Sequence, residues 1–122
     1  MPLTEAQWQA QVVGLARFYS WVVYHPPTNR PNARGRVQRV VAGFPDLTLA
    51  RETRLGDGEV ELIFAELKTD TGRLGPGQRD WLDLLGRVPG VEAVLWRPSD
   101  FEEVQTRLAR GRAISRPDWA PA

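Results

Sequence analysis

The chain has 122 residues, a formal net charge of +1, 42% hydrophobic and 25% charged residues, and no cysteine. This composition suits one globular domain, and with His25 as the single histidine it excludes a disulfide framework, a thiolate zinc site, a cysteine nucleophile and a multi-histidine metal centre. No apolar run approaches a membrane span, and no charged region followed by an apolar one opens the chain. We therefore expect a cytoplasmic protein.

Basic residues are unevenly distributed along the chain. No acidic residue lies between Glu5 and Asp46, although five arginines do: Arg17, Arg30, Arg34, Arg36 and Arg39. An unneutralised basic segment can attract phosphate groups. A solvated arginine-rich loop would have the same composition, so both interpretations stay open.

The first part of the chain predicts a helix, a strand and a loop. Residues 4–7 have the form of a capping box, and apolar residues follow at helical spacing, which predicts a helix over 5–19. The β-branched and aromatic stretch 21–24 favours a strand. Residues 25–36 are rich in proline, asparagine, glycine and arginine and indicate a loop, and 37–42 are compatible with a short turn of helix.

The middle of the chain predicts a β-hairpin. Residues 46–50 and 60–68 form strands, and Gly56-Asp57-Gly58 is a turn signal between them. If the turn centres on Asp57, Asp46 faces Lys68 and Thr48 faces Glu66.

The last part predicts a second helix, a strand and a third helix. Pro76 opens the second helix, whose expected apolar stripe is Trp81, Leu84, Leu85 and Val88. A strand over 91–96 follows, and a capping box at 99–102 begins a helix that ends near Ala109. The tryptophans expected in the core are Trp8, Trp81 and Trp96. The element order predicts an α/β domain over 1–110 with a mixed sheet flanked by helices, followed by a loosely held tail over 111–122.

The chemically informative residues are Asp46, Glu66 and Lys68. Glu66 and Lys68 are two positions apart on one strand, so they project from the same face, and the hairpin brings Asp46 to the same end. Two adjacent carboxylates repel each other unless a cation lies between them. A hard divalent ion such as Mg²⁺ prefers oxygen ligands, keeps several waters, and can activate water and neutralise charge on a phosphate. Phosphodiester hydrolysis needs this equipment.

Lys68 is also the one lysine among 16 basic residues. An arginine keeps its proton under all ordinary conditions, whereas a lysine can lose its proton in a crowded site. The alternative is chance, since a single lysine must lie somewhere. Its position two residues beyond a glutamate on an apolar strand favours a functional role.

The pair Pro45-Asp46 with Glu66-Leu67-Lys68 resembles the PD-(D/E)XK nuclease pattern. With Glu5, Gly43-Phe44-Pro45-Asp46 and Gln78 in order, the chain is similar to the VRR-NUC branch from about Thr4 to Phe101. The resemblance implies a restriction-endonuclease-like αβββαβ core and Mg²⁺- or Mn²⁺-dependent cleavage. It implies metal binding by Glu5, Asp46, Glu66 and the backbone carbonyl of Leu67, and it implies that Lys68 positions the nucleophile and that Gln78 also belongs to the catalytic site.

The segment after the first strand departs from this family. Relatives often have a histidine before an Asn-Gly stretch and more lysine in the basic segment, whereas His25 here precedes two prolines and Asn29 is followed by arginine. Glu5 and Gln78 alone would suit ordinary first-turn helix positions. The residues expected to contact nucleic acid are His25, Arg30, Arg34, Arg36 and Arg39.

The sequence thus predicts an endonuclease that hydrolyses DNA, with a likeness to phage and bacterial enzymes that act on branched DNA such as Holliday junctions. A junction substrate would favour a homodimer, because two cuts need two sites. Three alternatives stay open: a ribonuclease that uses the same residues, a non-catalytic nucleic-acid-binding module, and an interaction domain with a solvated charged surface.

Overall fold

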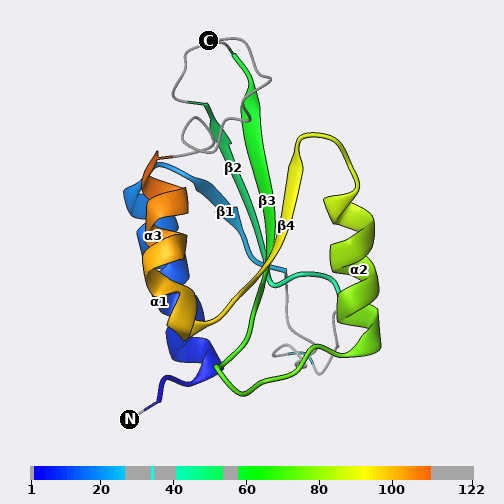
Figure 1. Ribbon diagram of the computed structural model, residues 1–122. Coiled ribbons are helices and arrows are strands. Elements are labelled where there is room, and N and C mark those ends of the chain that lie inside the picture. Colours follow the sequence, from blue (N-terminus) through cyan, green and yellow to red (C-terminus); the bar gives the residue numbers. More distant parts are fainter. Residues whose placement is uncertain (1, 27–33, 35–40, 54–57, 111–122) are drawn as a thin grey trace.

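The structure is a computed structural model, which describes residues 2–26, 34, 41–53 and 58–110. A four-stranded sheet lies between two helices on one face and a third helix on the other (Figure 1). No helix within these ranges is long and apolar enough to cross a membrane. The elements in chain order are α1 (Glu5–Phe18), β1 (Val22–Tyr24), β2 (Leu47–Glu52), β3 (Val60–Leu67), α2 (Pro76–Gly86), β4 (Val91–Trp96), the 3₁₀ helix η1 (Pro98–Asp100) and α3 (Phe101–Arg110).

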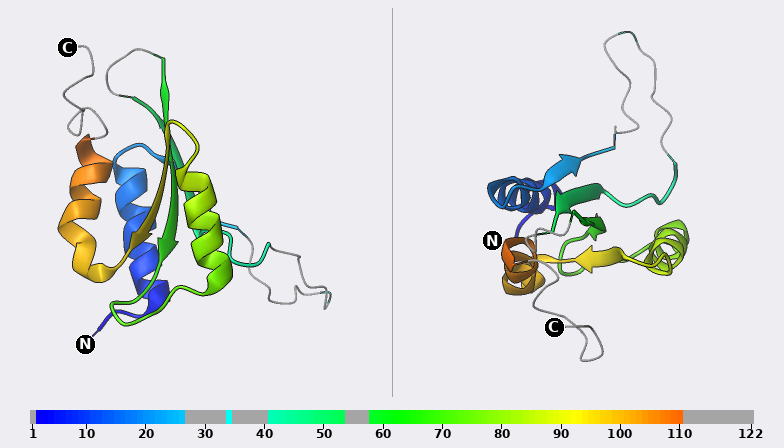
Figure 2. Two further views of the ribbon diagram at one scale, coloured as in Figure 1. Left: turned by 45° about the vertical axis from the view of Figure 1, so that its right-hand side comes forward. Right: turned by 90° about the horizontal axis from the view of Figure 1, so that it is seen from above.

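The strands follow one another across the sheet in chain order. The pairs β1–β2 and β2–β3 are antiparallel, and β3–β4 is parallel because α2 carries the chain back to the starting edge. The helix α2 covers the β3–β4 side of one face, while α1 and α3 pack together on the opposite face (Figure 2). The mixed sheet and the flanking helices confirm the predicted α/β class.

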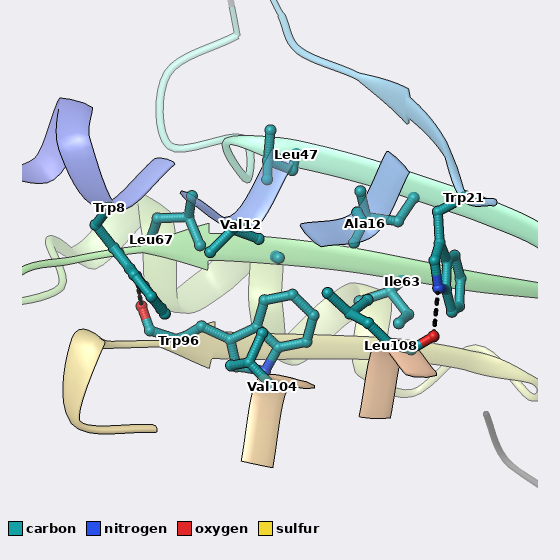
Figure 3. Close-up of a cluster of buried hydrophobic side chains, with 12 residues drawn as sticks. Trp8, Val12, Ala16, Trp21, Leu47, Ile63, Leu67, Trp96, Val104 and Leu108 are labelled. Carbon is teal, nitrogen blue, oxygen red and sulfur yellow. Dashed lines mark hydrogen bonds between the residues drawn. The ribbon is translucent and has the colours of Figure 1, made fainter. Parts of the chain in front are cut away.

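The core lies between the sheet and the α1–α3 layer (Figure 3). Alternate residues of β2 and β3 point into it, as expected for strands with one buried face. Trp8 and Trp96 belong to this core as predicted, whereas Trp81 is half-buried on the other face of the sheet. The twelve buried hydrophobic residues are Trp8, Val12, Ala16, Trp21, Leu47, Leu49, Ile63, Ala65, Leu67, Trp96, Val104 and Leu108.

The hairpin register differs from the predicted one by two residues. Thr48 pairs with Phe64, not with Glu66, and Leu47 pairs with Ala65. A shift of two residues keeps every side chain on its predicted face, whereas a shift of one would reverse the faces. The glycine-rich turn signal predicts the hairpin but not its centre. The observed register places Asp46 level with Glu66, one position beyond the Leu47–Ala65 pair.

Two further local predictions were wrong. The capping box at 99–102 is not used: Asp100 instead accepts a hydrogen bond from the backbone N–H of Arg97, at 2.9 Å, and caps η1. Leu84 and Val88 are exposed, because α2 leans on the sheet through a narrower stripe than its sequence indicates. The expected helical turn falls mostly on residues 35–40, the tail covers 111–122, and both lie outside the described residues.

Candidate active site

The loop that carries Asp46 packs directly against the start of α2. Gly43 has a φ of +81°, and a Cβ built on it would lie 2.5 Å from the carbonyl carbon of Gly77 and 2.8 Å from the backbone nitrogen of Gln78. Only glycine combines this left-handed conformation with such a close approach. Through Gly43, the Gly-Phe-Pro-Asp motif packs the loop before β2 directly against the backbone at the N-terminus of α2.

Phe44 holds the same loop on the sheet. Its ring makes edge-to-face contacts with Phe64 on β3 and Trp81 on α2, with centroids 5.8 Å and 5.0 Å apart. Such pairs stabilise by about 0.5–1.5 kcal/mol beyond their buried area. Pro45 is fully buried and restricts the backbone just before Asp46.

Asp46 is oriented by the end of β3. Its Oδ2 accepts a hydrogen bond of 2.8 Å from the backbone N–H of Leu67. This bond connects the first residue before β2 to the last residue of β3, and it directs the carboxyl group toward the neighbouring Glu66.

Glu66 is almost completely buried, with 1% of its surface exposed. Burial is the largest of several causes that together raise the pKa of Glu66 to about 9; hydrogen bonding with Asp46 and the charges of Asp46 and Glu5 act in the same direction, while Lys68 opposes the increase. The structure thus brings Asp46, Lys68 and Glu5 close enough to Glu66 for their charges to influence its pKa.

Gln78 reaches this unit from the first turn of α2. Its Oε1 accepts a hydrogen bond of 2.8 Å from the N–H of Gly75, and its Nε2 lies 3.5 Å from Glu66 Oε1. The first contact caps the helix, and the second is long for a hydrogen bond. Gln78 therefore both begins α2 and faces the buried carboxyl group.

Lys68 immediately follows β3, and its backbone is fixed by the end of β4. Its N–H donates to the carbonyl oxygen of Trp96 at 3.2 Å, and the same oxygen accepts a bond of 3.0 Å from Trp8 Nε1 on α1. This shared oxygen ties the first turns of α1, where Glu5 lies, to the position of Lys68. Figure 3 shows the Trp8–Trp96 contact.

The carboxyl groups of Asp46 and Glu66 could bind a metal ion that takes its remaining ligands from water. Glu66 Oε2 is buried and has no hydrogen-bond partner among the described residues, which is costly unless a proton or a cation satisfies it. Within the same ranges, no group of three or more His, Cys, Asp or Glu side chains is arranged to hold a metal. Asp46 and Glu66 would thus supply two oxygen ligands, in keeping with an ion such as Mg²⁺ that retains waters.

The predicted nucleic-acid contacts are less well defined. His25 is exposed just after β1, and Arg34 is exposed in a turn. Arg30, Arg36 and Arg39 lie outside the described residues. Their role in binding therefore stays a prediction.

Sequence reasoning missed a buried charge cluster at the opposite end of β2 and β3. Arg51 pairs with Glu61 at 3.1 Å, Glu61 pairs with Arg107 at 3.0 Å, and Arg107 pairs with Glu92 at 2.7 Å. Both guanidinium groups lie over the Trp21 ring, with Cζ 4.2 Å and 5.3 Å from its centroid. The alternating charges on β2 and β3 read as a solvated surface, and only the docking of α3 buries them.

Comparison with known proteins agrees with this geometry. The family model described as "VRR-NUC domain" matches residues 25–97, which include Asp46, Glu66, Lys68 and Gln78. A solved structure titled "VRR_NUC domain protein" is similar to this chain with a TM-score of 0.56 and 22% identity, covering 95% of this chain and 98% of the other. No curated protein matches the sequence significantly. The chain belongs to the VRR-NUC family.

Proposed function

We propose that the chain is a Mg²⁺- or Mn²⁺-dependent endonuclease that hydrolyses phosphodiester bonds in DNA. The observation that carries the proposal is the pair formed by Asp46 and the buried Glu66, whose free oxygen lies at the sheet end from which Lys68 emerges. A divalent cation held by this pair would neutralise the charge that develops on the phosphate. Membership of a nuclease domain family supports the same conclusion.

The residues of the chain divide the remaining tasks. Asp46 and Glu66 would bind and orient the metal ion. The Leu67 N–H fixes the carboxyl group of Asp46, and burial immobilises that of Glu66. Lys68 donates to or accepts from the attacking water, and its ammonium form stabilises negative charge beside it. Gln78 holds Glu66 Oε1 on the α2 side. Glu5 adds negative charge, which raises the pKa of Glu66 and would also attract a cation.

Cleavage assays test this proposal. Linear, nicked, flap and four-way DNA, single-stranded DNA and RNA should be incubated with Mg²⁺, Mn²⁺ or EDTA. We expect metal-dependent DNA cleavage that Asp46→Asn abolishes, because asparagine can still accept the Leu67 hydrogen bond but supplies no charge. Preferred cleavage of RNA would favour the ribonuclease alternative. If the protein binds these nucleic acids but cleaves none of them, a non-catalytic binding module is favoured.

A branched substrate and a homodimer belong to the same proposal. Resolution of a four-way junction requires two coordinated cuts, and a two-fold symmetric dimer supplies two sites. Sedimentation of the protein with and without junction DNA tests the assembly. A monomer that cleaves a junction on one strand only would contradict this part of the proposal and leave the nuclease assignment intact.

A further inference from the structure

The loop between β3 and α2 is held by a residue that the catalytic proposal does not use. Arg97 directly follows β4, and its Nη1 donates to two backbone carbonyl oxygens of this loop, those of Thr69 and Gly72, at 2.6 Å each. One nitrogen thus uses both of its hydrogens on two residues that lie three positions apart. A charged donor gives stronger hydrogen bonds than a neutral donor, so this contact closes the loop into a fixed turn.

The backbone of Arg97 is itself immobilised. Its N–H donates to Asp100 Oδ2 at 2.9 Å, and the neighbouring Trp96 carbonyl accepts the N–H of Lys68. A second tie connects the same segments, because Asp70 Oδ1 accepts a bond of 2.9 Å from the N–H of Ser99. The loop is therefore anchored from the end of β4 on both sides of Thr69.

The closed loop lies against the stem of Lys68. A Cβ built on Gly72 would be 3.4 Å from Lys68 Cδ and 3.2 Å from Thr69 Oγ1. The lysine stem thus passes beside Gly72, at contact distance from the place where any larger residue would put its Cβ. Whatever fixes the Gly72 carbonyl also limits the directions in which the Lys68 ammonium group can point.

We propose that Arg97 is a positioning residue that holds the Thr69–Gly72 turn against Lys68 and so fixes the direction of the lysine ammonium group. This inference rests on the proposed nuclease function. Arg97 itself need not touch the substrate. A displacement of a catalytic group by about 1 Å can lower a rate by about 10²-fold, so loss of this contact should act on the chemical step.

The test compares three variants of the full chain. Arg97→Met keeps the length of the stem but removes both donors. Arg97→Lys keeps one nitrogen with several hydrogens, although its stem is one bond shorter. Arg87→Met is the matched control, because Arg87 forms an exposed ion pair with Asp83 on α2, at 3.2 Å, away from the loop. Amide hydrogen exchange in EDTA, melting temperature, and kcat and KM on the cleaved DNA are measured for each.

We expect Arg97→Met to accelerate exchange of the Gly72 amide, which donates to Thr69, and to lower kcat by about 10- to 10²-fold. KM should change by less than about twofold, because the residue acts on positioning rather than on binding. Arg97→Lys should recover part of the lost kcat, and Arg87→Met should match the wild type. Loss of kcat in proportion to loss of folded protein would indicate a merely structural role and overturn the proposal.

A double variant asks whether Arg97 acts through Lys68. In a Lys68→Ala background, Arg97→Met should change the single-turnover rate by less than about twofold, since residues that act through one another are not additive. A full additional loss in this background overturns the proposal. The exchange measurement does not need catalysis: unchanged Gly72 exchange in Arg97→Met overturns the proposal whether or not the wild type cleaves DNA, whereas an inactive wild type contradicts the proposed function alone.

Discussion

Burial determines the chemistry of Glu66. An exposed glutamate would be ionised at neutral pH, but burial, together with the neighbouring Asp46, raises the pKa of Glu66 to about 9. The folded protein without metal therefore keeps a proton on Glu66 at neutral pH. The proposed metal ion would have to displace this proton, so we infer that affinity for the ion increases with pH.

The same shift makes the metal-free protein less stable at high pH. Because the folded-state pKa of about 9 lies above the ordinary value of 4.5, the stabilising contribution of Glu66 is fully present below the ordinary value and is lost as the pH rises through about 9. In EDTA at pH 9, Glu66→Gln should melt about 5 °C above the wild type, a shift that roughly 1–2 kcal/mol produces in a domain of this size. At pH 4 the two proteins should melt at similar temperatures.

Melting curves from pH 4 to pH 9 check this expectation, with cleavage as a second reading that the variant should lose. The control is Glu59→Gln, which changes an exposed glutamate near the start of β3. A constant difference between Glu66→Gln and the wild type at all pH values would show that the pKa of Glu66 does not differ between the folded and the unfolded protein.

Lys68 offers the sharpest residue-level test. We expect Lys68→Arg to fold and to bind DNA with near wild-type affinity, because the positive charge remains. Cleavage should fall by about 10²-fold or more, since arginine cannot exchange a proton and its planar fork can pair with Glu66. The measurement is single-turnover cleavage at saturating Mg²⁺, with binding measured in Ca²⁺. Near-normal cleavage would leave charge as the only property needed at this position.

At the scale of the elements, two short backbone contacts between segments position the proposed active site. The loop before β2 joins α2 through Gly43, and the end of β4 joins both α1 and the segment after β3 through the Trp96 carbonyl. Each joint involves backbone atoms, whose positions tolerate little change. The geometry of the carboxylate pair thus depends on the docking of α2 as well as on the hairpin.

Gly43→Ala tests the joint with α2. The new Cβ would meet the Gly77 backbone at 2.5 Å in addition to the strain of a positive φ, so we expect a loss of about 2–4 kcal/mol in unfolding free energy. Gly58→Ala is the matched control, because Gly58 has a similar φ of +78° and nothing within 4 Å. Denaturant titrations measure both, and equal losses would show that strain alone, without the contact to α2, explains the requirement for glycine.

Local patterns were sufficient to predict most elements and the faces of the strands. The capping box at Thr4 is formed as expected, and Pro76 opens α2, because both signals act within one turn of helix. The hairpin register and the role of Arg97 could not be predicted in this way. Arg97 contacts Thr69, 28 positions earlier, and no short-range pattern specifies such a pair. The proximity of Asp46 and Glu66 could be predicted, because they lie at the same end of two strands that are neighbours in the sequence and in the sheet.

At the scale of the whole molecule, the basic sequence segment directly follows β1 in the chain. The segment begins after β1, whose last residue Tyr24 pairs with Thr48, two residues from Asp46. The chain therefore leaves β1 at the end of the sheet where the carboxylates lie. Phosphates bound near that end would lie close to the proposed catalytic residues.

Replacement of Arg34, Arg36 and Arg39 by alanine should weaken DNA binding. The slope of log Kd against log salt concentration should decrease by roughly one for each phosphate contact that is lost. Binding is measured by titration at several salt concentrations in Ca²⁺. The control is Arg87→Ala on α2, and an unchanged slope in the triple variant would show that the segment is solvated and does not bind phosphate.

The buried charge cluster around Trp21 lies at the opposite end of the sheet from the proposed active site, so stabilising residues and proposed catalytic residues are separated in space. Arg51 and Glu61 lie at one end of β2 and β3, paired and buried, while Asp46 and Glu66 lie together at the other end. Substitutions at the two ends share no side-chain partner, so their free energies should add. Natural proteins change function at the expense of stability. In this domain, selection can alter the substrate at the carboxylate end while the opposite end maintains the fold, which makes the scaffold well suited to diversification.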